Sequence, residues 1–261
     1  MSPQHPVDQA IRGLTLLGYS QDRREASPGE QMLLTLFWQK PPGSNDAAES
    51  VDLKLRDATG QVIQSWTLPP VRSDYPPEAW PSGQDQRGQH ALRLSGGLLT
   101  GDYAFELEGR PLGSLFVTAP ERAFEEPAYE VPAGVDFAGQ AELVGYTLEP
   151  DPADPQALIL TLVWRGRSEM IESYRVFVHL VDENGQIGAQ SDAEPAAWSR
   201  PTTGWAVGEY VVDQHLLRLP DAVQLADWAL RIGLYDARSG TRLPVGDQDA
   251  FLVLPGGLNS P

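Results

Sequence analysis

The stretch VDLKLRDATGQVIQSW, residues 51–66, decides the fold. In VDLKLR, residues 51–56, apolar and charged side chains alternate strictly, which is typical of a strand with one buried face. DATG, residues 57–60, supplies turn-forming residues before the second run, QVIQSW. The stretch therefore predicts an antiparallel hairpin with an apolar and a polar face.

The same pattern returns in the second half of the chain. YRVFVHLVDENGQI, residues 174–187, ends in DENG, and its Asn-Gly pair provides the positive φ angles that a tight hairpin needs. Including this pair of turns, six segments recur in one order, at offsets that drift only from 127 to 125. The other five pairs are LGY 17–19 and VGY 144–146, LLTLFW 33–38 and ILTLVW 159–164, WPSG 80–83 and WAVG 205–208, QHALRL 89–94 and QHLLRL 214–219, and DYAF 102–105 and DWAL 227–230. We infer an internal duplication.

Each copy contains several short alternating runs and no amphipathic pattern long enough for a helix of about ten residues. In the first copy we expect strands near residues 11–19, 31–38, 51–57, 61–68, 89–94, 101–108 and 114–118. The predicted fold class is all-β, with two tandem immunoglobulin-like antiparallel β-sandwiches; a closed barrel is the alternative. The predicted domains are a degenerate first repeat at residues 1–120, a charged, proline-containing linker at 121–134, and a second repeat at 135–256.

Composition excludes several classes of function. Among 261 residues, 19 are Lys or Arg and 36 are Asp or Glu, and a net charge of −17 repels nucleic acid. The absence of cysteine excludes disulfides, a thiol nucleophile and thiolate metal sites. We expect no metal and no cofactor. The start of the chain does not read as a signal peptide, and the longest apolar run, residues 157–164, is too short to span a membrane. A fragment of a larger membrane protein would read the same way.

The second copy resembles a known type of domain. YRVFVHLVDENGQ at 174–186 is followed by AQSD at 189–192, by Trp205 and Asp213, and by LRIGLYDARSGTRLP at 230–244. This series is similar to the β-sandwich domain at the C-terminal, extracytoplasmic end of bacterial (Chloroflexota-type) membrane glycosyltransferase-like proteins. The resemblance implies an accessory module outside the membrane, without catalytic residues of its own.

Aromatic side chains gather in one loop of the second copy. Trp198, Trp205 and Tyr210 lie close in sequence to the polar residues Arg200 and Asp192, a combination that suits glycan binding. Trp205 also recurs in the first copy as Trp80, and a repeated tryptophan can equally cap a core. A binding role predicts that these aromatic rings are exposed, whereas a purely structural spacer predicts that they are buried.

A second candidate surface is the outer face of strand 174–181. Phe177, His179 and Val181 share this face, whereas the first copy carries charged side chains there. An apolar outer face usually marks a contact. We expect either packing within the protein or an interface with a partner.

The other motifs have simpler explanations. Asp192 with Glu194, and Asp247 with Asp249, are the acidic pairs that a glycosidase would need, but both lie in polar turns. DENG at 182–185 faintly matches the start of a calcium loop and lacks its later ligands. We therefore expect a non-catalytic envelope module that binds a glycan or a protein; the alternatives are a structural spacer and, last, a carbohydrate-active hydrolase.

Overall fold

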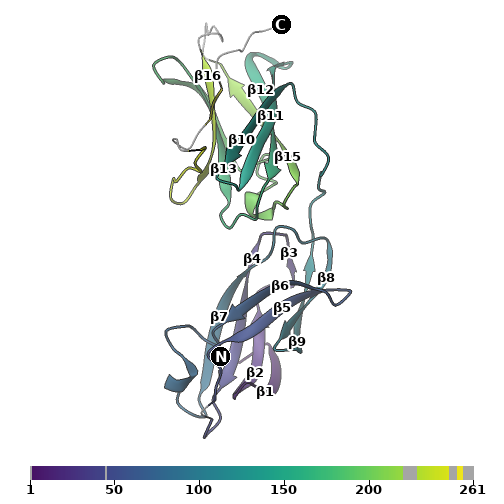
Figure 1. The fold of residues 1–261 in the computed structure, drawn as a ribbon, viewed down its shortest axis with the longest axis vertical. Helices are drawn as coiled ribbons and strands as arrows, with labels where there is room; N and C mark the ends of the chain where they lie inside the picture. Colours follow the sequence, from purple (N-terminus) through teal and green to yellow (C-terminus); the bar gives the residue numbers. More distant parts are fainter. Residues whose placement is uncertain (1, 45, 220–227, 247–251, 255–261) are drawn as a thin grey trace. The chain divides into compact units, whose positions relative to one another are not determined.

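The computed structural model describes residues 2–44, 46–219, 228–246 and 252–254. The chain divides into two compact units, residues 1–120 (unit 1) and 121–261 (unit 2). Figure 1 shows that both consist of β-strands. The described helices are two single turns of 3-10 helix.

Unit 1 contains two sheets with the strand orders β1-β2-β4-β7 and β3-β9-β8-β5-β6. Neighbouring strands are antiparallel, except that the short edge strand β3 runs parallel to β9. The elements are β1 (His5–Ile11), β2 (Leu14–Gln21), β3 (Glu25–Ala26), β4 (Gln31–Gln39), β5 (Val51–Asp57), β6 (Val62–Leu68), η1 (Pro77–Ala79), β7 (Asp85–Arg93), β8 (Gly101–Leu107) and β9 (Arg110–Val117).

Unit 2 contains two antiparallel sheets with the orders β10-β11-β12-β15 and β14-β13-β16-β17. The elements are β10 (Val131–Phe137), β11 (Ala141–Asp151), β12 (Asp154–Gly166), β13 (Tyr174–Val181), β14 (Ile187–Ala193), η2 (Thr202–Gly204), β15 (Tyr210–Arg218), β16 (Ala229–Asp236) and β17 (Leu252–Leu254).

The two units repeat one arrangement. Their first sheets join four strands in the same sequential order, and β6-β5-β8-β9 of unit 1 corresponds to β14-β13-β16-β17 of unit 2. In the part of the chain that the structure describes, each unit has two separate sheets, so the prediction of all-β antiparallel sandwiches is confirmed and the closed barrel is wrong. The common origin of the units stays a prediction from the repeated sequence.

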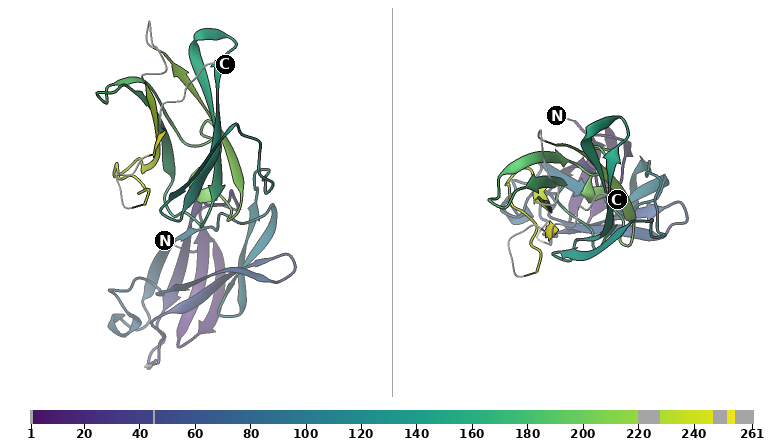
Figure 2. Two further views of the ribbon diagram at one scale, coloured as in Figure 1. Left: turned by 45° about the horizontal axis from the view of Figure 1, so that its top comes forward. Right: turned by 90° about the horizontal axis from the view of Figure 1, so that it is seen from above.

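Each unit has its own core of buried side chains, to which both of its sheets contribute. Figure 2 shows the ribbons of these sheets. In unit 1 the alternation of VDLKLR is realised as expected, because Val51, Leu53 and Leu55 are buried inside. Trp38 and Trp164 occupy matching places in strands β4 and β12, and both are fully buried. In the described residues no helix is long and apolar enough to cross a membrane.

The hairpin turns of the two units are also alike. In unit 1 the side chain of Asp57 accepts hydrogen bonds from the amides of Thr59 and Gln61, both at 2.9 Å. In unit 2 the side chain of Asp182 accepts from Asn184 and Gln186 in the same way, at 2.9 and 2.7 Å. A turn with this pattern needs no calcium ion to hold its shape.

The structure adds a first strand to each unit that the sequence reasoning did not predict. β1 has the pattern HPVDQAI, in which polar residues and a proline hide the alternation. β10 begins at Val131, so residues 131–134 of the predicted linker are part of a strand, and residues 121–130 belong to unit 2. Tyr129 packs there against Gly145, where a Cβ would lie 2.3 Å from the tyrosine ring.

Candidate functional site

The three loop aromatics lie in different surroundings. All seven tryptophans are in the described residues, and Trp198 alone is exposed, at 54%. Trp205 is fully buried, and its Nε1 donates to the carbonyl of Arg200 at 3.0 Å. The counterpart Trp80 donates to the carbonyl of Tyr75 at 3.1 Å. The matching bonds identify Trp205 as a core residue that a surface ligand does not touch.

Tyr210 is likewise buried, and it anchors the first residues of unit 2. Its amide donates to the carbonyl of Ala123 at 2.8 Å, and its hydroxyl donates to Glu126 at 3.3 Å. The guanidinium of Arg165 lies over its ring, 5.5 Å from the centroid. The predicted cluster of three exposed aromatics therefore reduces to Trp198.

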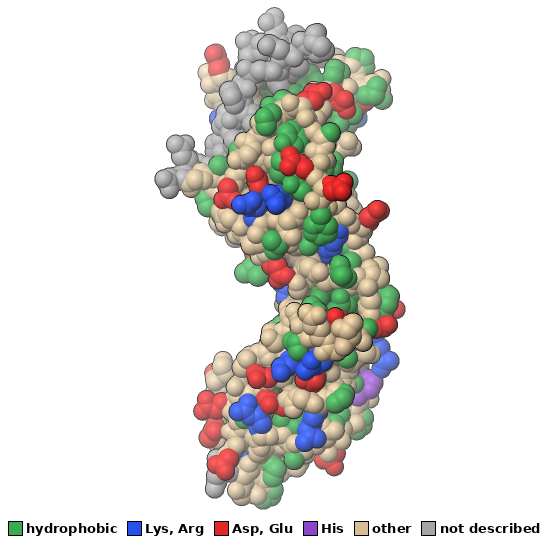
Figure 3. Space-filling model, turned by 45° about the vertical axis from the view of Figure 1, so that its right-hand side comes forward, with side chains coloured by type: hydrophobic (Ala, Val, Ile, Leu, Met, Phe, Trp, Pro, Cys, Tyr) green, Lys and Arg blue, Asp and Glu red, His purple; other side chains and the backbone are tan. Residues whose placement is uncertain are grey.

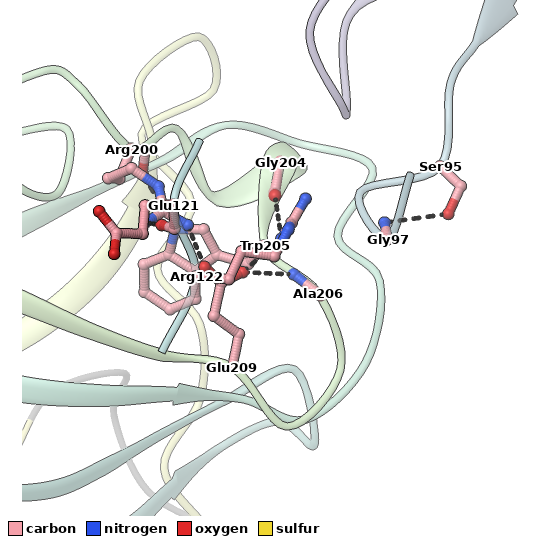
Figure 4. A network of polar contacts seen from close by, with 9 residues as sticks. All are labelled: Ser95, Gly97, Glu121, Arg122, Arg200, Gly204, Trp205, Ala206 and Glu209. Atoms are coloured by element: carbon pink, nitrogen blue, oxygen red, sulfur yellow. Dashed lines mark hydrogen bonds and ion pairs between the residues drawn. The ribbon is translucent and has the colours of Figure 1, made fainter. Parts of the chain in front are cut away.

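Arg200 belongs to a buried ion cluster that the sequence reasoning missed (Figure 4). Glu209 has no exposed surface and is held by Arg200 and by Arg122, whose side chain is 5% exposed. The amide of Ala206 also donates to Glu209 at 2.9 Å, and Arg122 donates to the carbonyl of Gly204 at 3.2 Å. Removing one partner from a buried carboxylate that is shared by two guanidiniums leaves an uncompensated buried charge, which strongly lowers the stability of the fold.

The predicted interface is only partly accessible. Phe177 and Val181 are almost completely buried, and the guanidinium of Arg242 lies 4.7 Å above the ring of Phe177. His179 has 17% of its side chain exposed, and its Nε2 lies 3.9 Å from Asp192. Burial lowers the pKa of His179, and nearby Asp192 opposes that shift. This arrangement corresponds to the packing alternative, not to an open apolar surface.

Of the two acidic pairs, Asp192 and Glu194 lie in the described residues, and their side chains have separate surroundings. Asp192 faces outward beside His179, whereas Glu194 accepts a hydrogen bond from the hydroxyl of Ser173 at 2.9 Å. The second pair, Asp247 and Asp249, lies outside the described residues.

Residues 194–200 form a left-handed turn, here called the Trp198 turn. Ala196, Ala197 and Trp198 have φ angles of 52°, 51° and 71°. The amide of Trp198 donates to the carbonyl of Glu194 at 3.0 Å. A left-handed conformation costs a non-glycine residue about 1–2 kcal/mol, so the surrounding contacts must hold three such residues in place.

One face of the exposed indole is covered by an arginine. The guanidinium of Arg175, from β13, lies 4.8 Å from the centroid of the Trp198 ring. Its Nε atom is buried without a hydrogen-bond partner, and within the described chain Arg175 has no ion pair. Because Trp198 is more than half exposed, the remaining indole surface faces solvent next to a cation.

A line of polar side chains supports the turn from inside. Asp213 accepts a hydrogen bond from the amide of Ala196 at 2.8 Å, and its other oxygen lies 2.9 Å from Nε2 of His215. Nδ1 of His215 lies 2.9 Å from the hydroxyl of Ser191. Asp213 and His215 are buried in the space between β15 and the facing edge strand β14.

This line has the residue types of a Ser-His-Asp hydrolase triad, but its geometry differs. Ser191 pairs across the strands with Val178, whose side chain is in the core, so its hydroxyl faces the sandwich interior. The histidine is also turned the other way: Nδ1 of His215 contacts the serine and Nε2 the aspartate, whereas in a catalytic triad Nε2 contacts the serine. The line is suited to closing the edge of the sandwich and holding the turn.

The comparisons with known proteins give distant likenesses. No protein-family model matches the chain, and no curated protein matches it. Among solved structures, a DUF4785 family protein from Legionella pneumophila is 13% identical, with a TM-score of 0.25, covering 90% of this chain and 56% of that one. Trypsin-activated alpha-2-macroglobulin from Escherichia coli is 13% identical, with a TM-score of 0.28 and coverage of 98% and 16%.

A glycosyl hydrolase family 2 member from Bacteroides cellulosilyticus is 8% identical, with a TM-score of 0.26 and coverage of 88% and 27%. The chain thus spans about half the length of the Legionella protein and less than a third of the other two. At these TM-scores the likenesses carry no argument. The resemblance to glycosyltransferase-associated domains stays a prediction.

Proposed function

We propose that the chain is a non-catalytic binding module and that unit 2 recognises an acidic glycan at Trp198 and Arg175. The observation that carries the proposal is the exposure of Trp198 on a turn of three left-handed residues. Strain of this kind persists where a fixed geometry serves a purpose, and here it holds a large apolar ring in solvent.

The ring and its neighbour define the chemistry of the ligand. The negative face of an indole attracts the weakly positive C–H groups on the flat side of a pyranose ring. A guanidinium binds a carboxylate through two parallel hydrogen bonds. A sugar ring that bears a carboxylate, as in a uronic acid, can therefore stack on the indole of Trp198 and pair its carboxylate with the guanidinium of Arg175.

Local charge supports an anionic ligand despite the acidity of the protein. Unit 2 contains nine arginines against 22 Asp and Glu residues, and within its described residues Arg175 has no ion pair, as is also true of Arg165, Arg218 and Arg238. What distinguishes Arg175 is its position against the exposed indole of Trp198. On the face drawn in Figure 3, acidic and basic side chains are interspersed. Selectivity then rests on the short-range contact with Arg175 and not on a long-range field. The position of an accessory module outside a membrane, implied by the resemblance, is part of the same proposal.

The test is a fluorescence titration of the purified chain with polygalacturonate, alginate and a neutral polysaccharide such as pullulan. We expect acidic polymers to shift the tryptophan emission and to raise the melting temperature, because a ligand of the native state stabilises it. Trp198→Ala should abolish both effects. Phe124→Ala, which removes another exposed aromatic ring of unit 2, is the matched control. No response to any glycan would favour a protein partner or a structural spacer.

A further inference from the structure

The two units provide a direct comparison for the Trp198 turn. Residues 66–93 align with residues 191–218 at a constant offset of 125. Both segments start in an edge strand that faces the other sheet, β6 or β14, and both reach a 3-10 turn followed by a tryptophan. Positive φ angles occur in residues 196–198 of unit 2, whereas no non-glycine residue between 69 and 75 has one. The backbone conformation therefore differs between the two units although the flanking strand and 3-10 turn match and the connecting segment has the same length.

One substitution lies directly against this segment. Gly88 pairs with Leu36 in unit 1, and its counterpart Asp213 pairs with Leu162 in unit 2. A Cβ on Gly88 would lie 2.0 Å from the carbonyl oxygen of Pro70. No side chain fits there while the Pro70 carbonyl occupies that space.

In unit 2 the carboxylate of Asp213 lies where that carbonyl lies in unit 1, beside the matching histidine. The ring of His90 lies beside the Pro70 carbonyl, since the same Cβ on Gly88 would lie 2.9 Å from Nε2 of His90. The matching His215 meets Asp213 instead, at 2.9 Å. The second oxygen of Asp213 accepts the amide of Ala196, the first left-handed residue of the turn, at 2.8 Å.

We infer that Asp213 is the positioning residue of the Trp198 turn: its side chain excludes the backbone path of unit 1 and holds the left-handed path that presents Trp198 beside Arg175. This inference rests on the proposed function for its biological meaning. Its structural content is independent of any ligand, because it concerns where one indole lies.

The experiment labels the chain with 5-fluorotryptophan and assigns the Trp198 resonance in the fluorine spectrum with Trp198→Phe. Asp213→Gly restores the residue of unit 1, and we expect it to shift the Trp198 resonance and to weaken binding of polygalacturonate at least tenfold. Asp213→Asn keeps the volume and an acceptor oxygen for Ala196, and we expect it to retain the resonance. Val212→Gly places a glycine at the adjacent, outward-facing position and controls for glycine in β15.

An unchanged Trp198 resonance in Asp213→Gly would overturn the inference. If Asp213→Gly does not fold, Asp213→Ala removes the acceptor and keeps the Cβ, and an unchanged resonance in that variant would overturn the claim that the carboxylate holds the left-handed path. If the resonance moves while the unmodified chain binds no acidic glycan, Asp213 is the positioning residue and the proposed function fails. If the unmodified chain and Asp213→Gly bind equally well, the glycan site does not depend on Asp213 and the inference is wrong.

Discussion

The guanidinium of Arg175 lies 4.8 Å from the centroid of the Trp198 ring, and these two side chains come from different elements of unit 2. Arg175 is part of strand β13, whereas Trp198 lies on a strained turn after strand β14. A cation–π contact at a partly exposed site contributes about 0.5–1 kcal/mol, less than the turn costs. The cation–π contact alone therefore does not compensate for the strain of the turn. Other contacts must do so, such as the hydrogen bond from the amide of Ala196 to Asp213, and a ligand bound to the exposed indole would add to them.

The strain of the turn makes one stability prediction with an unusual sign. Ala197→Gly should raise the free energy of unfolding by up to about 1 kcal/mol, because glycine adopts the left-handed region without a Cβ penalty. Ala104→Gly, at an exposed position in strand β8, should lower it by a similar amount. Urea unfolding of both variants makes the comparison. A loss of stability in Ala197→Gly as large as that in Ala104→Gly would mean that residue 197 is not held in a strained conformation.

Urea unfolding should also distinguish Trp198 from Trp205, because substitution of the two residues should change the free energy of unfolding by different amounts. Trp205→Ala is expected to cost about 3–5 kcal/mol, since it leaves a cavity in the core of unit 2. Trp198→Ala should change stability by less than about 1 kcal/mol, as surface substitutions usually do. Equal losses in the two variants would place Trp198 in the core and contradict its exposure.

This contrast shows what the sequence can and cannot predict about the site. Alternation in VDLKLR and the repeated Asp-x-x-Gly turns are local signals, so the sandwich class and the hairpins were predictable. Exposure is not local: Trp198 and Trp205 are seven residues apart in one loop, and only the packed sheets decide that one ring is covered and the other is not.

The sequence reasoning also missed Glu209 and Asp213 as structural residues. Both lie where the first copy has an uncharged residue, Gln84 or Gly88, so a comparison of the repeats position by position was the signal that pointed to them. Arg122 was assigned to a linker because its neighbours are charged. Its burial against Glu209 depends on a long-range contact across 87 residues that no local pattern reveals.

The ion cluster of unit 2 should respond strongly to the loss of its central carboxylate. Glu209→Ala leaves two guanidiniums without their partner, and we expect it to destabilise unit 2 by about 3–5 kcal/mol. Glu142→Ala removes the partner of Arg167 in an exposed pair and should cost about 1 kcal/mol or less. Denaturant unfolding compares the two variants, and a Glu209→Ala variant as stable as Glu142→Ala would contradict the structural role of the cluster.

Unit 1 should lose stability in mild acid through His90. Burial lowers the pKa of this histidine below its ordinary value of 6.5, and the nearby Pro70 carbonyl opposes the shift only in part. The unfolded chain then takes up a proton as the pH falls through 6.5 while the folded chain resists it. The neutral form stabilises the fold fully above pH 6.5, and this contribution is lost as the pH falls toward the folded pKa.

The measurement is the free energy of unfolding of the original chain and of His90→Gln between pH 8 and pH 5. The difference at pH 8 gives the cost of the substitution itself. We expect the original chain to lose more stability than His90→Gln as the pH falls. Parallel curves for the two proteins would show that His90 titrates alike in the folded and unfolded states.

The line of Ser191, His215 and Asp213 should not act as a hydrolase triad. We expect a fluorophosphonate probe, which labels activated serines, to leave Ser191 unmodified in intact-mass and peptide mass spectrometry, because the hydroxyl faces the sandwich interior. Label on Ser191 that disappears in His215→Gln would reveal an activated nucleophile and would replace the non-catalytic proposal.

Binding of an acidic sugar by Trp198 and Arg175 together can be measured by calorimetry. Uronic acid oligomers are titrated into the unmodified chain and, separately, into Arg175→Gln. We expect saturable binding by the unmodified chain, at least tenfold weaker binding by Arg175→Gln, and no binding of the corresponding neutral oligomers. Equal affinity of both proteins for the acidic oligomer, or no binding by the unmodified chain, would contradict the proposed function.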